Sequence, residues 1–128
     1  MARKILVIED DPVLARLVDL TLKRAGYESI IASNGLAGME HVRADPSPDL
    51  VLLDLMLPVM DGFEVLNLIR SDPRTADLPV IVVTGKTQTT DRQLALQLGA
   101  NDYITKPYRP QNIVARIEDH FAQQTLSA

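Results

Sequence analysis

The segment 51–62, VLLDLMLPVMDG, places an acidic residue inside an apolar run. Its first residues, 51–53, are consecutive aliphatic residues, which is typical of a strand buried on both faces. Asp54 interrupts the run, and apolar residues resume at Leu55. A carboxylate at the end of a buried strand is costly to ionise unless a cation or a hydrogen-bond donor compensates its charge. The segment therefore predicts a buried parallel strand and a carboxylate that needs a partner.

Apolar runs of strand length recur along the chain and alternate with amphipathic stretches of helix length. The strand candidates are 4–9, 28–32, 50–54, 79–84 and 102–105. The helix candidates are 12–25, 36–44, a stretch from 61 onward, about 89–98 and about 110–123. Five such strand–helix pairs predict a doubly wound α/β domain with a parallel sheet and right-handed crossovers.

Local signals mark several helix boundaries. Asp11 followed by Pro12 suits an N-cap with proline at the first helical position, and Gly26 is placed to end that helix. Asp61 is expected to cap the third helix, with Glu64 three residues later as in a capping box. Asp11 and Asp61 are therefore interpreted mainly as helix caps.

The overall composition indicates one globular domain, which we expect over 1–123 with a short frayed tail at 124–128. The chain has 128 residues, of which 46% are hydrophobic and 23% charged. A net charge of −4 without any basic stretch argues against direct nucleic-acid binding. The absence of cysteine excludes disulfides and thiolate metal sites. No apolar run approaches the ~20 residues that span a bilayer, and no signal peptide is evident, so we expect a cytoplasmic protein without membrane contact.

Polar residues stand at the ends of four predicted strands. In an open parallel sheet the functional crevice lies beyond these carboxyl ends. The residues expected there are Glu9, Asp10, Asp11, Asp54, Thr84 and Lys106. Two carboxylates ~4 Å apart repel by about 4 kcal/mol at an effective dielectric constant of ~20. A hard divalent cation relieves this repulsion, and Mg²⁺ suits carboxylate and carbonyl oxygens.

Phosphoryl transfer is the chemistry that uses this combination of groups. An aspartate carboxylate can act as a nucleophile and form an acyl phosphate. A metal ion and a lysine then neutralise the charge on the transferred oxygens. Asp54 is the expected nucleophile because it ends the central strand, and Lys106 and Thr84 are the expected cation and hydroxyl donor.

Four segments in register resemble the receiver domain of bacterial two-component response regulators. They are ILVIEDD (5–11), DLVLLDLMLPVMDG (49–62), PVIVVTG (79–85) and GANDYITKPY (99–108), and the resemblance covers nearly the whole chain. It implies a flavodoxin-like sheet of strand order 2-1-3-4-5. It also implies a phospho-acceptor that switches a partner-binding face and turns over no separate substrate.

The resemblance assigns roles to individual residues. Asp54 would be phosphorylated by a sensor histidine kinase or a histidine phosphotransfer protein. Mg²⁺ would bind Asp10, Asp54 and the backbone carbonyl of Met56, while Glu9 would act mainly through water.

Further implied roles concern the switch. Thr84 would bond a phosphoryl oxygen, and Lys106 would pair with the phosphoryl group. Tyr103 would be the switch aromatic that turns inward when Thr84 moves. The Lys106–Pro107 peptide would be cis. The output protein or fused output domain would bind residues 88–123.

The last two motifs look closest to the branch whose receivers precede winged-helix DNA-binding domains, with three departures. Asn101-Asp102 replaces an acidic pair, and Asn112 replaces a glutamate, both positions used in that branch's dimer salt bridges. Gly85 stands where alanine is commoner, which should loosen the following loop. We therefore expect a monomer or a weak, phosphorylation-dependent dimer, and no output domain within these 128 residues.

Particular residues argue against two other functions. An aspartate-nucleophile phosphatase needs a second acid where this chain has Met56, and Glu9-Asp10-Asp11 would repel the phosphate of a flavin. A pseudo-receiver that takes no phosphate, or a receiver excised from a larger DNA-binding regulator, stays open. His41 and His120 lie on predicted helices away from the strand ends, and we expect both to be solvated surface residues.

Overall fold

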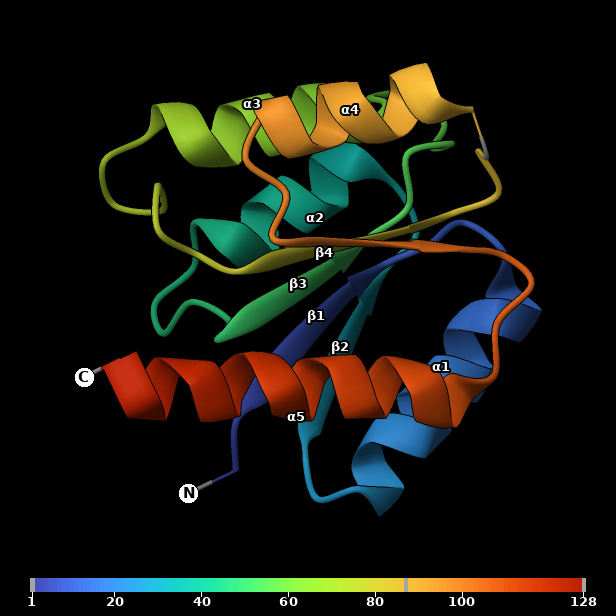
Figure 1. Ribbon diagram of the computed structural model, residues 1–128, viewed down its shortest axis with the longest axis vertical. Coiled ribbons are helices and arrows are strands. Elements are labelled where there is room, and N and C mark those ends of the chain that lie inside the picture. Colours follow the sequence, from blue (N-terminus) through green and yellow to red (C-terminus); the bar gives the residue numbers. More distant parts are fainter. Residues whose placement is uncertain (1, 87, 128) are drawn as a thin grey trace.

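A single five-stranded parallel sheet forms the centre of the molecule (Figure 1). The computed structural model describes residues 2–86 and 88–127, with side chains up to residue 124 in the last helix. Neighbouring strands follow the order β2-β1-β3-β4-β5, as the resemblance implied. The strands are β1 (Lys4–Ile8), β2 (Glu28–Ala32), β3 (Leu50–Leu53), β4 (Val80–Thr84) and β5 (Asp102–Thr105).

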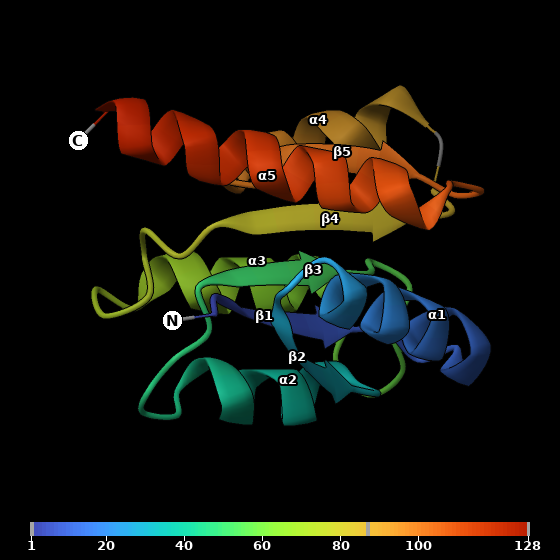
Figure 2. The same cartoon turned by 90° about the horizontal axis from the view of Figure 1, so that it is seen from below.

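Helices cover both faces of the sheet, which explains why the central strands are apolar without alternation. They are α1 (Pro12–Arg24), α2 (Gly35–Val42), α3 (Gly62–Ser71), α4 (Thr89–Gln97) and α5 (Pro110–Ser127). Figures 1 and 2 show α1 and α5 on one face and α2, α3 and α4 on the other. Each face has its own core, so that Val51 and Leu53 pack toward α3 while Leu50 and Leu52 pack toward α5.

The predicted helix caps are confirmed. The Asp11 carboxylate accepts hydrogen bonds from the backbone N–H groups of Val13 (2.9 Å) and Leu14 (3.3 Å), and α1 begins at Pro12. The Asp61 carboxylate accepts the N–H of Glu64 at 3.1 Å and starts α3. These caps fix the points at which the chain leaves β1 and β3, where the polar residues stand.

Two helix boundaries differ from the prediction. The Asn34 side chain caps α2 through the N–H of Ala37, so this helix begins at Gly35 and ends at Val42 rather than spanning 36–44. Helix α5 was expected to end at 123 with a frayed tail after it, but it continues to Ser127. No glycine or proline follows residue 123 to end the helix, so the hydrogen-bonded backbone continues. Residue 128 lies outside the described part of the chain.

The Lys106–Pro107 peptide is cis, as the resemblance implied, and the Asp45–Pro46 peptide is also cis, which was not predicted.

Within residues 2–86 and 88–127, no helix is both long and apolar enough to cross a membrane.

Val59 lies in a rare backbone conformation just beyond the β3 strand. Its φ of 71° is the one positive value among the described non-glycine residues, and the N–H of Met60 donates to the carbonyl of Pro58 at 2.8 Å. This is a γ-turn of the strained type, and a β-branched residue fits it poorly. The Val59 side chain is also 84% exposed, so burial does not offset the strain.

We predict that Val59→Asn stabilises the domain by about 1 kcal/mol, because a positive φ is costlier for a β-branched residue than for asparagine. Urea unfolding at equilibrium measures the change. Val13→Asn is the matched control, since Val13 is 73% exposed but lies in the regular backbone of α1. An equal gain in both variants would show that the positive φ of Val59 is not the cause.

Candidate functional site

The predicted site residues converge at the carboxyl edge of the sheet. Glu9 follows β1, Asp54 follows β3, Thr84 ends β4 and Lys106 follows β5. Backbone hydrogen bonds continue the sheet at this edge, because the N–H of Asp54 donates to Ile8 at 3.1 Å and the N–H of Lys106 donates to Thr84 at 2.8 Å. The topology therefore brings together residues that are up to 97 positions apart in the chain.

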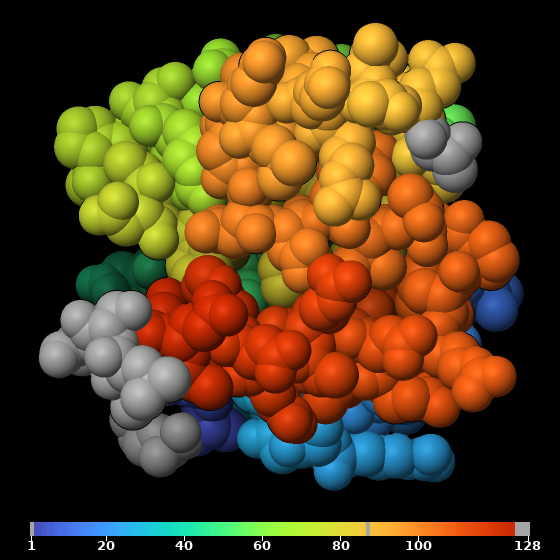
Figure 3. Space-filling model, in the orientation of Figure 1, coloured from blue at the N-terminus to red at the C-terminus, as the bar shows by residue number. Residues whose placement is uncertain are grey.

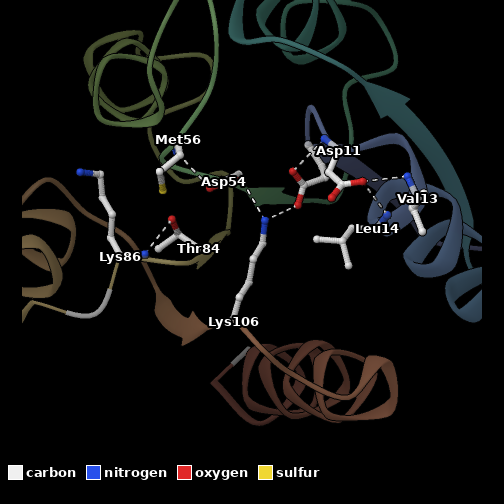
Figure 4. Close-up of polar contacts among 9 residues, drawn as sticks. Asp11, Val13, Leu14, Asp54, Met56, Thr84, Lys86 and Lys106 are labelled. Atoms are coloured by element: carbon white, nitrogen blue, oxygen red, sulfur yellow. Dashed lines mark hydrogen bonds and ion pairs between the residues drawn. The ribbon is translucent and has the colours of Figure 1, made fainter.

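The Lys106 ammonium group bridges two buried carboxylates (Figure 4). Its Nζ lies 2.6 Å from Oε1 of Glu9 and 2.9 Å from Oδ2 of Asp54. Glu9 and Asp54 are only 6% and 4% exposed, so both carboxylates need this partner. Lys106 therefore supplies the positive charge that the sequence led us to expect beside the buried Asp54 carboxylate.

Backbone donors hold the other carboxylate oxygens. The N–H of Met56 donates to Oδ1 of Asp54 at 3.0 Å, and the N–H of Asp11 donates to Oε2 of Glu9 at 3.2 Å. The loop after Asp54 returns tightly at Gly62, where an added Cβ would lie 2.4 Å from the Asp54 carbonyl oxygen. The glycine thus permits the close approach that fixes the loop beside the carboxylate.

The charges in this cluster influence one another. Burial raises the pKa of Glu9, while the hydrogen bond from Lys106 acts in the opposite direction. Burial alone would lower the pKa of Lys106, but its hydrogen bonds to Glu9 and Asp54 outweigh burial, and the pKa is raised above its usual value. Lys106 therefore stays protonated at neutral pH and holds one positive charge between two acidic groups.

A third carboxylate makes the cluster acidic overall. Oxygen atoms of Glu9, Asp10 and Asp54 lie within 4.8 Å of one another, and Asp10 is exposed to solvent. This all-oxygen set, with one lysine against three acidic groups, fits a hard divalent cation such as Mg²⁺. The Asp11 carboxylate is used in capping α1, which agrees with its interpretation as a cap.

Thr84 and Tyr103 are linked through Lys86, a residue that the sequence did not single out. The N–H of Lys86 donates to Oγ1 of Thr84 at 3.4 Å (Figure 4), and the Tyr103 hydroxyl donates to the Lys86 carbonyl at 2.7 Å. The Tyr103 ring is buried, with only 4% exposed. Lys86 takes part through its backbone, so no side-chain signal could have indicated it.

The two histidines lie on α2 and α5, away from this edge of the sheet. His41 is half-exposed, consistent with a surface residue. His120 differs from the prediction, because its Nε2 atom is buried where the helix packs beside the sheet.

We predict that Lys106→Met lowers the free energy of unfolding by about 3 kcal/mol in metal-free buffer, because it leaves two buried carboxylates without their cation. Lys23→Met is the matched control. Lys23 pairs with Asp19 on the exposed face of α1, and its loss should cost about 0.5 kcal/mol or less. Urea unfolding in the presence of a chelator compares the two variants. Equal losses would contradict a structural role for the Lys106 bridge.

Comparison with known proteins agrees with this geometry. The family model of the response regulator receiver domain matches residues 5–118. The chain is 41% identical over 117 residues to the DNA-binding response regulator MtrA of Mycolicibacterium smegmatis. The match covers 91% of this chain but 50% of MtrA, so the chain spans about half the length of that relative.

Solved structures show the same likeness. A response regulator receiver domain protein (CheY-like) from Methanospirillum hungatei matches with a TM-score of 0.91, at 26% identity over 100% of both chains. The phosphorylated cyanobacterial phytochrome response regulator RcpA matches with a TM-score of 0.83, at 33% identity over 93% of each chain. Sequence and fold agree, and the chain belongs to the family of response regulator receiver domains.

Proposed function

We propose that this receiver accepts a phosphoryl group on Asp54 from a histidine kinase or a histidine phosphotransfer protein. The observation that carries the proposal is the Lys106 bridge, which places an ammonium group 2.9 Å from the Asp54 carboxylate at the carboxyl edge of the sheet. The phosphorylated state named for the related RcpA structure supports the same chemistry. The domain would assist its own phosphorylation and dephosphorylation without a separate substrate.

The transfer step uses the Asp54 carboxylate as nucleophile. One of its oxygens attacks the phosphorus atom of a phosphohistidine, a P–O bond forms and the P–N bond breaks. The electron pair goes to the imidazole nitrogen, which then takes a proton from water. Lys106 lies 2.9 Å from Asp54 and can contact the new phosphoryl oxygens, whose charge it would partly neutralise.

Mg²⁺ is the proposed cofactor. Asp10, Asp54 and the Met56 carbonyl would bind it directly, and Glu9 would act through water. When bound, the ion supplies positive charge against the carboxylates and the phosphoryl oxygens. The exposed position of Asp10 beside the buried Asp54 supports access from solvent.

Thr84 and Tyr103 are the proposed switch. A phosphoryl group on Asp54 would attract the Thr84 hydroxyl, and Thr84 is connected through Lys86 to the Tyr103 hydroxyl. Tyr103 lies on β5 between α4 and α5, which together with β5 form the face seen in Figure 3. This face, residues 88–123, is the proposed binding surface for an output protein or a fused output domain.

A groove beside Lys106 is the proposed contact for the phosphodonor. Leu14, Leu17, Pro107 and Tyr108 line it, and Leu17 is 45% exposed. Apolar residues next to the acceptor suit the helix of a partner that presents a phosphohistidine.

The name of MtrA supports a further proposal, that this receiver belongs to a DNA-binding regulator in which another domain contacts DNA. Asp102 pairs with Arg116 of the same chain at 2.5 Å, and Asn101 accepts hydrogen bonds from Arg70 and Val80. Because Asn101 and Asp102 already bind partners within the same chain, they are less available for salt bridges between two copies. This supports a monomer or a weak dimer.

We predict that acetyl phosphate with Mg²⁺ adds one phosphoryl group to the protein, as measured by intact mass, and that Asp54→Asn abolishes the adduct. Asp61→Asn is the matched control from the same loop, because asparagine also caps helices. Its adduct should equal that of the parent protein.

An adduct that persists in Asp54→Asn would contradict the assignment of the acceptor. Absence of an adduct together with intact Mg²⁺ binding would favour the pseudo-receiver.

We also predict that Asp10→Asn lowers the affinity for Mg²⁺ by about tenfold or more, because one negative ligand is lost. Asp11→Asn should leave the affinity nearly unchanged, since Asp11 caps α1 and asparagine preserves the cap. Calorimetric titration with MgCl₂ compares the variants. Equal affinities in the parent protein and Asp10→Asn would remove Asp10 from the metal site.

A further inference from the structure

His120 presents an unsatisfied polar atom inside the fold. Among the described residues, its Nε2 is the one buried side-chain nitrogen or oxygen without a hydrogen-bond partner. The ring packs edge-on against Phe121, with centroids 6.2 Å apart and planes at 69°. Buried polar groups are rarely left unpaired, so this position calls for a physical explanation.

The histidine faces a polar pocket between α5 and the start of β5. This is the amino end of the strands, opposite to the edge that holds Asp54. Helix α5 contributes Arg116, Asp119 and Gln123, β5 contributes Asp102, and Ile81 closes the β4 side. The charged groups around the ring are therefore two carboxylates and one guanidinium.

Two further arginines, Arg70 and Arg3, lie near the residues that line this pocket. The Arg70 guanidinium reaches the pocket wall by donating to the Asn101 side-chain oxygen at 2.9 Å. That oxygen also accepts the N–H of Val80 at 2.8 Å, so it is already used twice. The Arg3 guanidinium lies 4.0 Å above the Phe121 ring.

The Asp102 carboxylate ties β5 to α5. Its Oδ2 lies 2.5 Å from Nη1 of Arg116, and its Oδ1 accepts the N–H of Tyr103 at 2.8 Å. Any new donor that reaches Asp102 must share or replace these partners. The next residue, Tyr103, is the one whose hydroxyl contacts the loop after β4.

We propose that His120 is a proton-sensitive group that acts on the Asp102–Arg116 ion pair. When Nε2 gains a proton, it becomes a charged donor that must find an acceptor, and the Asp102 carboxylate is the charged acceptor across the pocket. The imidazolium then competes with Arg116 for Asp102 and loosens the contact between α5 and β5. This effect of His120 protonation on the ion pair does not depend on phosphorylation of Asp54.

The direction of the pH effect follows from the surroundings of the ring. Burial lowers the pKa of His120, and the negative charge of Asp102 acts in the opposite direction. With the folded-state pKa below the unfolded value of 6.5, the unfolded chain binds the proton first as pH falls. His120 therefore contributes stability that is present above pH 6.5 and is lost as pH falls through this value toward the folded-state pKa.

The test is a titration of the two histidine rings by NMR between pH 8 and 5, with His41 as the internal reference. We expect the midpoint of His120 to lie below the unfolded-state value of 6.5. The amide resonance of Tyr103 and the side-chain resonance of Arg116 should move with the His120 midpoint. Asp102→Asn should lower the His120 midpoint further, because it removes the neighbouring negative charge that raises the pKa.

Two variants complete the test. In His120→Gln the pH-dependent movements of Tyr103 and Arg116 should vanish, and the urea midpoint should fall less between pH 7 and 5.5 than in the parent protein. His41→Gln should behave like the parent protein in both measurements. Movements that persist unchanged in His120→Gln, or a His120 midpoint unaffected by Asp102→Asn, would overturn the proposal.

Discussion

The ammonium group of Lys106 between Glu9 and Asp54 is the interaction on which the functional edge of this domain depends. It joins the ends of β1 and β3 to the segment after β5, and it does so at a place where both carboxylates are almost fully buried. Removing the cation would leave two charges in a poorly solvated crevice. With Asp10 nearby, the cluster holds three carboxylates and one lysine, so the same arrangement also favours a divalent cation.

A second set of contacts connects this edge of the sheet with helix α5. Thr84 contacts the backbone of Lys86, and Lys86 accepts the Tyr103 hydroxyl. Tyr103 follows Asp102, whose carboxylate pairs with Arg116 on α5. These contacts run from the carboxyl edge of the sheet through β5 to α5. The proposed phosphorylation of Asp54 and the proposed protonation of His120 would both act on β5.

Much of the fold, and the convergence of the site residues, could be predicted from the sequence, for physical reasons that differ between residues. Unbroken apolar runs marked the strands, and Asp11 and Asp61 marked helix starts because capping is a local interaction. The convergence of Asp54 and Lys106 followed from topology, since parallel strands end at one edge. The family match and the fold bear out the receiver, whereas the roles of the individual site residues stay predictions.

What the sequence did not reveal depends on tertiary packing. Nothing local distinguishes His120 from a surface histidine, because its burial arises from residues of β5 that lie far away in the chain. The γ-turn at Val59 opposes local preference, and valine gives no signal for it. The last turn of α5 was missed because the apolar face that predicted the helix ends at Phe121, although Gln123 and Gln124 themselves favour a helix.

A crystal structure of the protein with Mg²⁺ and beryllofluoride, a stable mimic of an acyl phosphate, would test the central claim most directly. The account predicts the beryllofluoride on the Asp54 carboxylate, with Mg²⁺ bound by Asp10 and Asp54 and the Lys106 ammonium group in contact with the adduct. An adduct on another carboxylate, or a metal ion bound away from Asp10 and Asp54, would contradict it.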